Sequence, residues 1–265
     1  MREFDQELIW EYARSIKLPT ALVEKDYVLS VVLLSISKFP EADDLVFKGG
    51  TALRKAYFAD YRLSADLDFT GVSDIKLKLK DSLSDIQNKE IEGVSFLELS
   101  DKTMKGFNSL NLVLQYKSKI GTTPNKKHID NIKLDFNFDN IVYLKPEKIK
   151  VVSPKEFSLE EFEINTMQIE EIICEKIHAI HKRPKPRDLY DFHNLLKRGY
   201  KINIDLADKK LSSLAVRFEI EGFSKHVEKL RAKWEIDMKG LLPFVPDFDI
   251  IAREALEFVK KQLQG

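Results

Sequence analysis

Cysteine is almost absent from this sequence. Cys174 is the single cysteine in 265 residues, and it lies within a helical pattern without a second cysteine to pair with. An intramolecular disulfide and a zinc cluster built from several cysteines are therefore both excluded. A reducing compartment fits this composition, and we expect the protein to act in the cytoplasm.

The sequence also lacks an excess of charge and any long apolar run. Lys and Arg together number 43, as do Asp and Glu, so the formal net charge is zero and any site for a polyanion has to be local. No stretch approaches the roughly 20 apolar residues that a membrane span needs, and the charged segment 1–15 lacks the apolar core of a signal peptide. We therefore expect a globular protein without a membrane partner.

The residue patterns predict an α+β fold in two parts. Residues 1–152 alternate between helical and strand patterns, which predicts a mixed, mostly antiparallel sheet after a helical entry. Residues 153–265 carry helical patterns and predict an α-helical domain. The expected helices span residues 5–17, 20–34, 51–57, 74–92, 166–183, 187–198, 205–219, 224–236 and 247–263, and the expected strands span 45–47, 63–69, 94–99, 110–116 and 132–138.

Acidic side chains lie at alternate positions of two predicted strands. At a period of two, Asp66 and Asp68 project from the same face of their strand, and Asp135 is placed in the same way on a later strand. Three neighbouring carboxylates repel one another unless a cation neutralises them. Mg²⁺, or Mn²⁺, would do so and could bridge triphosphate oxygens, with Asp135 as a candidate base. The alternative is the solvated face of an edge strand. Two further polar positions on the first face are Arg62 and Ser64.

A Gly-Gly pair separates a predicted strand from a predicted helix. Gly49 and Gly50 would let the backbone approach a ligand closely, and the amides at the helix start, with the Thr51 hydroxyl, suit a phosphate group. A tight turn that needs positive φ explains the same pair without a ligand. The spacing matches neither the P-loop nor the dinucleotide-binding glycine pattern.

The order of these signals is more specific than each alone. A strand, Gly-Gly-Thr, a helix and an Asp-x-Asp strand together resemble the DNA polymerase β type nucleotidyltransferase superfamily. The resemblance narrows to the AbiEii/AbiGii toxin family and spans residues 24–196, with no motif beyond 200. The segments that carry it are Glu24-Lys25-Asp26-Tyr27, Lys48-Gly49-Gly50-Thr51-Ala52-Leu53, Arg62-Leu63-Ser64-Ala65-Asp66-Leu67-Asp68-Phe69, Glu175-Lys176 and Arg187-Asp188-Leu189-Tyr190-Asp191.

This resemblance implies a composite active site for NTP and Mg²⁺ between the two domains. It implies that Asp66, Asp68 and Asp135 bind the metal, and that Lys176 and Asp191 also belong to the catalytic set. The nucleotide-binding set that it implies is Lys48, Gly49, Gly50, Thr51, Arg62, Ser64, Lys176 and Arg187.

Two residues of the helical domain also have structural interpretations. Lys176 lies at the edge of an apolar stripe, where a lysine can extend its ammonium to water along an apolar stem. Arg187 and Asp191 are spaced for an ordinary ion pair within one helix. The resemblance instead places Lys176 on the triphosphate and Asp191 at the mouth of the active site.

The predicted activity is transfer of a nucleoside monophosphate from an NTP to an acceptor. By resemblance, the protein is the toxin of a toxin–antitoxin pair linked to abortive infection and phage defence, with a cognate antitoxin as a possible partner. Some relatives modify tRNA at its 3′ end, and two basic clusters motivate the same acceptor here. The alternatives are a protein or small-molecule acceptor, or a catalytically silent nucleotide-binding module. The clusters are Lys117, Lys119, Lys126, Lys127 and His128, and His178, His181, Lys182, Arg183, Lys185 and Arg187.

Overall fold

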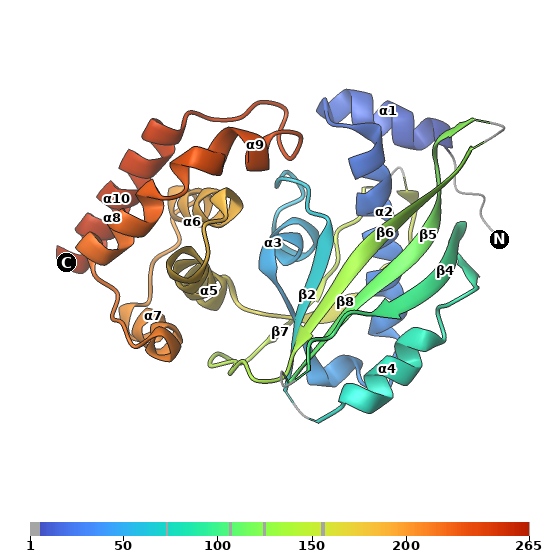
Figure 1. Ribbon diagram of the computed structural model, residues 1–265, viewed down its shortest axis with the longest axis horizontal. Coiled ribbons are helices and arrows are strands. Elements are labelled where there is room, and N and C mark those ends of the chain that lie inside the picture. The colour runs from blue at the N-terminus through green and yellow to red at the C-terminus, as the bar shows by residue number, and fades with distance from the viewer. Residues whose placement is uncertain (1–5, 73, 106–107, 124–125, 155–156, 265) are drawn as a thin grey trace. The chain divides into compact units, whose positions relative to one another are not determined.

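The chain folds into two compact units, Met1–Met167 and Gln168–Gly265 (Figure 1). This architecture comes from a computed structural model that describes residues 6–72, 74–105, 108–123, 126–154 and 157–264, without the side chains of residues 121–127. The expected boundary after residue 152 lies earlier than this division. Residues up to Met167 belong to the first unit because they include a strand of its sheet.

Eight strands of the described residues form one mixed sheet in the first unit, in the order β3-β4-β5-β6-β2-β1-β8-β7. The β2–β6 and β1–β8 pairs are parallel and the other pairs antiparallel, which confirms the mixed, mostly antiparallel sheet. The strands are β1 (Leu45–Lys48), β2 (Asp66–Gly71), β3 (Glu90–Ile91), β4 (Val94–Asp101), β5 (Ser109–Thr123), β6 (Lys126–Asn137), β7 (Glu147–Lys150) and β8 (Glu163–Thr166).

The apolar face of this sheet packs against helices. α1 (Gln6–Ile16), α2 (Thr20–Ser37) and α4 (Lys76–Ser84) contribute to the same buried core as Leu67 and Phe69 of β2 and Leu134 and Phe136 of β6. α2 is buried around most of its circumference, as its largely apolar sequence requires. Because side chains alternate along a strand, Asp66, Asp68 and Asp135 lie on the opposite face of the sheet.

The Glu-Lys-Asp-Tyr segment of α2 binds this helix to four other parts of the first unit. Four consecutive residues each have a different partner, so the segment anchors a buried helix. Glu24 accepts hydrogen bonds from Ser118 Oγ and the Lys119 amide, Lys25 pairs with Asp130 at 3.1 Å, Asp26 pairs with Lys55 at 2.7 Å, and the Tyr27 hydroxyl donates to the Glu92 carbonyl at 2.8 Å.

Several expected elements of the first unit differ from the observed ones. The strand expected at 63–69 begins only at Asp66. The helix expected at 74–92 ends at Ser84 and gives way to β3. Glu92 and Gly93 both have positive φ and form a two-residue hairpin turn between β3 and β4, so this end of the expected helix is a hairpin. β7 and β8 have no counterpart among the expected strands. Both are strands of four residues, and β8 also pairs with β1, which is distant in sequence, so local patterns reveal them poorly.

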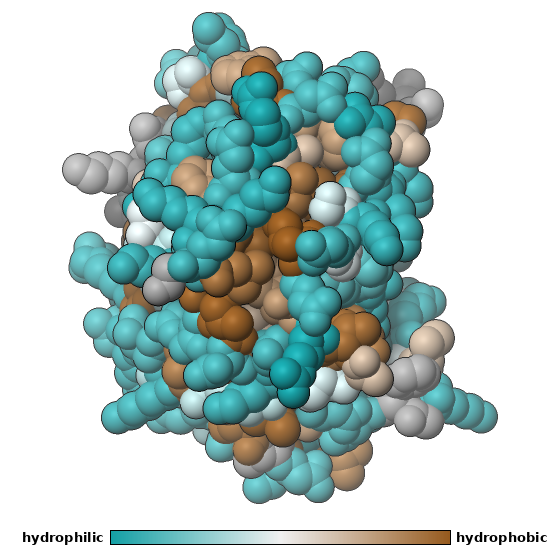
Figure 2. All heavy atoms as spheres, turned by 90° about the vertical axis from the view of Figure 1, so that its left-hand side faces the viewer, coloured by the Kyte–Doolittle hydropathy of each residue, from teal (hydrophilic) through white to brown (hydrophobic). Residues whose placement is uncertain are grey.

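The second unit is helical, as expected. The helix expected at 205–219 ends as an α-helix at Leu211, and the one expected at 224–236 is divided into two. Figure 2 shows a largely hydrophilic face of this unit with an apolar band in a hollow. The helices are α5 (Ile169–Lys182), α6 (Pro186–Lys197), α7 (Ile204–Leu211), α8 (Ile220–Glu228), α9 (Trp234–Met238) and α10 (Phe248–Gln264).

Among the helices that the structure describes in either unit, none has the length and apolar character that crossing a bilayer requires.

Candidate active site

A row of polar residues crosses three adjacent strands of the first unit. In the strand register, Asp68 of β2 lies between Lys48 of β1 and Asp135 of β6. Asp66 lies two residues earlier on the same face, with Lys133 as its neighbour on β6. Parallel pairing of β2 and β6 therefore brings together the two carboxylate strands that the sequence suggested. Lysines on the flanking strands partly offset the resulting negative charge.

The Gly-Gly turn is shaped by close approach of two charged side chains. A Cβ at Gly49, where φ is +79°, would lie 2.6 Å from Asp68 Oδ2, and a Cβ at Gly50 would lie 2.5 Å from Arg62 Nη2. Both distances are too short for a real carbon, so a larger residue would have to displace the Asp68 carboxylate or the Arg62 guanidinium. At Gly49 the positive φ also disfavours any other residue. Gly49 therefore places the backbone of the turn directly against the Asp68 carboxylate.

The segment after this turn starts earlier than expected and is not a regular helix. α3 (Gly49–Ala52) includes both glycines, and a π-helical turn (Leu53–Tyr57) follows it. Thr51 Oγ1 donates a hydrogen bond to the Asp66 carbonyl, so the turn and the start of β2 are joined directly. Single π-helical turns are frequent at functional sites.

Arg62 and Ser64 are buried in the segment that precedes β2, and are not part of a strand face as the alternating pattern suggested. The guanidinium of Arg62 lies against Gly50, and its Nη1 donates to the Leu63 carbonyl at 3.1 Å. Arg62 therefore lies at the Gly-Gly turn because its segment before β2 packs there, and not because it shares a strand face with Asp66 and Asp68.

Asn111 is a member of this site that sequence reasoning missed. It lies opposite Asp135 in the β5–β6 register, and its Nδ2 donates to Asp135 Oδ1 at 2.7 Å. The available signal was the alternation of β5, which places Asn111 on the polar face. Nothing in the local sequence says which residue of β6 it faces.

The donor chemistry of the row fits a hard divalent cation, since Asp66, Asp68 and Asp135 offer carboxylate oxygens on one face. Within the described residues, however, no group of three or more His, Cys, Asp or Glu side chains is placed so that it could hold a metal ion. The ligand roles of the three aspartates therefore stay a prediction.

In the second unit, Lys176 is the centre of a buried ion cluster. Its Nζ lies 3.0 Å from Asp188 Oδ1 and 2.6 Å from Asp191 Oδ2, and all three side chains are at most 8% exposed. The Lys176 ammonium is thus bound between two carboxylates, and the side chain does not extend along the apolar stripe to place the ammonium in water. Burial alone would raise the pKa of Asp188, but the charges of Lys176 and Arg183 and their hydrogen bonds lower it to about 2.

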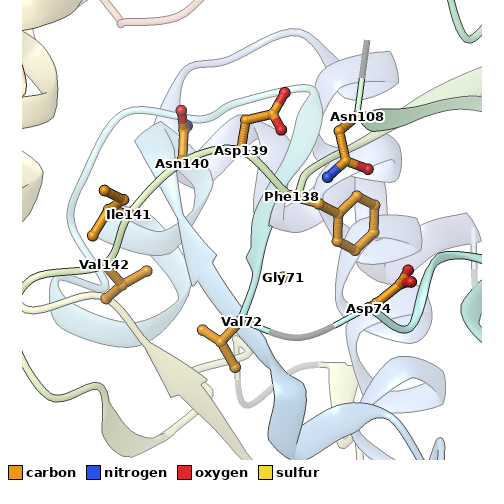
Figure 3. Close-up of a pocket in the computed structure, with 9 residues that line it drawn as sticks. All are labelled: Gly71, Val72, Asp74, Asn108, Phe138, Asp139, Asn140, Ile141 and Val142. Atoms are coloured by element: carbon orange, nitrogen blue, oxygen red, sulfur yellow. The ribbon is translucent and has the colours of Figure 1, made fainter. Parts of the chain in front are cut away.

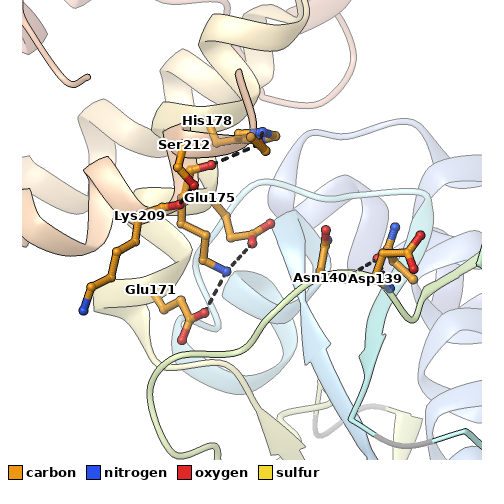
Figure 4. A network of polar contacts seen from close by, with 10 residues as sticks. Asp139, Asn140, Glu171, Glu175, His178, Lys209 and Ser212 are labelled. Atoms are coloured by element: carbon orange, nitrogen blue, oxygen red, sulfur yellow. Dashed lines mark hydrogen bonds and ion pairs between the residues drawn. The ribbon is translucent and has the colours of Figure 1, made fainter. Parts of the chain in front are cut away.

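Part of the basic cluster of the second unit is engaged internally. Arg183 pairs with Asp188 at 3.1 Å, and His178 contacts Ser213 Oγ. The His181 ring packs against that of His226 at a tilt of 37°, with centroids 4.8 Å apart. A neighbouring polar network joins α5 to α7, because Lys210 of α7 lies 2.7 Å from both Glu171 and Glu175 of α5. Figure 4 shows these two glutamates side by side on α5.

The basic cluster of the first unit lies on the β5–β6 hairpin. Lys117 and His128 are exposed there, and the side chains of Lys126 and Lys127 lie outside the described part of the structure.

A cavity of about 610 Å³ lies at the end of β2 and β6 that is remote from Asp66. Its wall includes the carboxylates of Asp74 and Asp139 and the ring of Phe138, which lies against the Cα of Gly71 (Figure 3). None of the expected site residues lines this cavity.

The sheet topology, the Gly-Gly turn and the Asp-x-Asp strand together define a nucleotidyltransferase. The solved structure of MenT4, a nucleotidyltransferase toxin from Mycobacterium tuberculosis H37Rv, matches with a TM-score of 0.72 and 19% sequence identity over 97% of this chain and 90% of that chain. At that identity the match shows a shared fold. No match is found among curated proteins.

The family model of the AbiEii nucleotidyl transferase toxin of type IV toxin–antitoxin systems matches residues 31–257. The chain therefore belongs to the AbiEii family and is a nucleotidyltransferase toxin, which confirms the family resemblance, the fold class and the enzyme class. The matched region begins after the Glu-Lys-Asp-Tyr segment of α2. It also includes most of the chain beyond residue 200, where the sequence alone showed no motif.

Proposed function

We propose that the protein is a divalent-metal-dependent enzyme that transfers a nucleoside monophosphate from an NTP to a hydroxyl acceptor. The observation that carries the proposal is the register of β1, β2 and β6, which sets Lys48, Asp68 and Asp135 side by side with Asp66 next along the same face. Such a row offers oxygen ligands for a cation and a lysine for an anionic group.

In this proposal Asp66, Asp68 and Asp135 hold Mg²⁺, or Mn²⁺ in its place. When bound, the metal supplies charge neutralisation for the triphosphate during in-line displacement. In the proposed step the acceptor oxygen bonds to the α-phosphorus, the bond from that phosphorus to the oxygen that bridges to the β-phosphate breaks, and pyrophosphate leaves. Asp135 would accept the proton of the attacking hydroxyl, and Lys48 would hold a phosphate oxygen beside Asp68.

Gly49, Gly50, Thr51, Arg62 and Ser64 complete the nucleotide-binding set of the first unit. Asp68 and Arg62 approach the two glycines closely, and a side chain at either position would displace them, which supports a role in keeping this turn against the carboxylate row. In the second unit we propose Lys176, Asp191 and Arg187 for the roles that the family pattern implies, contact with the triphosphate and the mouth of the site.

We further propose the 3′ end of tRNA as the acceptor and the cytoplasm as the place of action. Exposed basic side chains on the β5–β6 hairpin and on the segment between α5 and α6 support a polyanionic acceptor. A cognate antitoxin is the proposed protein partner, and defence against phage by abortive infection is the proposed cellular role.

Incubation with each labelled NTP, Mg²⁺ and total RNA or purified tRNA tests the proposal. Wild-type protein should label tRNA, and Asp68→Asn should lower kcat/KM by about 10³-fold or more, equivalent to roughly 4 kcal/mol of transition-state stabilisation. Asp139→Asn, just beyond the end of β6 and exposed, is the matched control and should keep full activity. Label in protein or in a small molecule would replace the tRNA proposal, and no metal-dependent transfer to any acceptor would overturn the enzymatic one.

A further inference from the structure

Asn111 is a neighbour of the carboxylate row, and its side chain is held at both ends. Its Nδ2 donates to Asp135 Oδ1 at 2.7 Å, and its Oδ1 accepts from Ser109 Oγ at 3.1 Å. An amide can present either its oxygen or its nitrogen to a neighbour. An ionised carboxylate only accepts hydrogen bonds, so Asp135 itself favours the orientation in which the nitrogen faces it, and the Ser109 hydroxyl then donates to the oxygen at the other end.

The backbone of Asn111 is also tied down. Its amide donates to Thr103 Oγ1 at 3.0 Å, and its carbonyl accepts from the Lys102 amide at 2.8 Å. Asn111 therefore lies in a strand paired on both sides, with little freedom to move away from Asp135. Hydrogen bonds of this kind hold a ligand carboxylate within the narrow range of geometry that catalysis needs.

The neutral amide of Asn111 also suits this position better than a charged side chain would. A lysine here would neutralise Asp135 and weaken its attraction for a cation, whereas a second carboxylate would repel it. A neutral amide fixes Oδ1 and leaves the negative charge of Asp135, and its other oxygen, for the reaction.

We propose that Asn111 is a positioning residue of the active site, which acts through Asp135 by fixing one carboxylate oxygen so that the other meets the metal or the acceptor hydroxyl. This inference rests on the proposed metal-dependent transfer. It assigns a role to a residue of β5, a strand that contributes no residue to the predicted catalytic set.

Three variants and one control test the role. Asn111→Leu removes the donor at similar volume, Asn111→Asp replaces it with a repelling carboxylate, and Ser109→Ala frees the amide without removing it. The matched control is Asn131→Leu, the same change at an exposed position on the same face of the β5–β6 hairpin.

The measurements are the Mn²⁺ dissociation constant by electron paramagnetic resonance, the metal concentration for half-maximal transfer, kcat, KM for NTP and the midpoint of thermal unfolding. Asn111→Leu should weaken Mn²⁺ binding and raise the activating metal concentration by about 10- to 100-fold. Asn111→Asp should weaken Mn²⁺ binding at least as much as Asn111→Leu, and Ser109→Ala should weaken it less. Asn131→Leu should bind Mn²⁺ and be activated by the metal as the wild type is. A purely structural residue would instead lower the unfolding midpoint and leave the metal constants unchanged.

The two proposals fail in different ways. If the wild type transfers nucleotide and Asn111→Leu behaves as Asn131→Leu in both metal constants, the inference is overturned and the proposed function stands. If the wild type transfers nothing yet binds Mn²⁺ with an affinity that depends on Asn111, the positioning role stands and the proposed reaction falls. A wild type that binds no Mn²⁺ overturns both.

Discussion

Removing one partner of the buried pair of Lys55 and Asp26 should strongly destabilise the first unit. Lys55 Nζ lies 2.7 Å from Asp26 Oδ2 and 3.0 Å from the Asp26 carbonyl, and both side chains are 1% exposed. Asp26→Asn keeps the shape but removes the compensating charge. Breaking one partner of such a pair costs about 3–5 kcal/mol, because the remaining charge stays buried. In a unit of this size that corresponds to a fall of roughly 6–20 °C in melting temperature.

The sign of the pH dependence follows from Lys55. Burial lowers the pKa of Lys55, and the charge of Asp26 opposes that shift. Removing the opposing charge lowers the folded pKa further below the unfolded one. The unfolded state of the variant then binds the proton more readily than the folded state, so its stability rises with pH up to the ordinary pKa of lysine. The deficit of Asp26→Asn should therefore narrow as the pH rises towards 10.5, the ordinary pKa of lysine.

Urea unfolding followed by tryptophan fluorescence measures this effect. The two tryptophans lie in different units, so a Trp234→Phe background leaves Trp10 as the reporter of the first unit. The exposed pair Lys38 and Glu160 is the control, and Glu160→Gln should cost at most about 1 kcal/mol.

A second variant checks that the loss comes from the charge. Asp26→Leu with Lys55→Met replaces the pair by apolar side chains and should recover most of the lost stability. The reasoning is refuted if Asp26→Asn costs no more than Glu160→Gln, or if the double variant is less stable than the single one.

Three further predictions concern the two units. Gly49→Ala should lower the rate of nucleotide transfer by at least about tenfold, because its Cβ would lie 2.6 Å from the Asp68 carboxylate. Gly199→Ala is the control, since it has comparable backbone strain at φ +92° but no neighbour within 4 Å. Equal transfer rates for the two variants would contradict the prediction. The pKa of Asp188 is lowered to about 2, so above pH 3.8 its ionised form should contribute about 2 kcal/mol to the free energy of unfolding, and this contribution is lost as the pH falls towards 2. The free energy of unfolding of Asp188→Asn should therefore depend less on pH in this range than that of wild type. Burial lowers the pKa of His181, so the free energy of unfolding of the wild type should decrease as the pH falls below about 6.5, and that of His181→Phe should decrease less. Identical dependence of the free energy of unfolding on pH in the two proteins, measured by chemical denaturation, would exclude this contribution.

Local patterns were enough to predict much of the first unit. The alternation that sets Asp66 and Asp68 on one face depends only on the period of a strand, and the Gly-Gly pair reports a backbone that comes close to another group. The fold class followed from the order of these elements. In the second unit, the apolar stripe of α5 predicted its buried face and placed Lys176 at the edge.

Other features depended on which distant segments pack together. That Asp135 lies beside Asp68, and Asn111 beside Asp135, follows from strand pairing and register that no local pattern encodes. The same is true of Arg62 against Gly50. By itself the sequence determined the chemistry of the side chains and, within a regular strand or helix such as β2 from Asp66 onward, the face that each side chain occupies, because both are set by neighbours along the chain. Tertiary structure alone decided which of them meet, because register and burial are set by the packing of the whole unit.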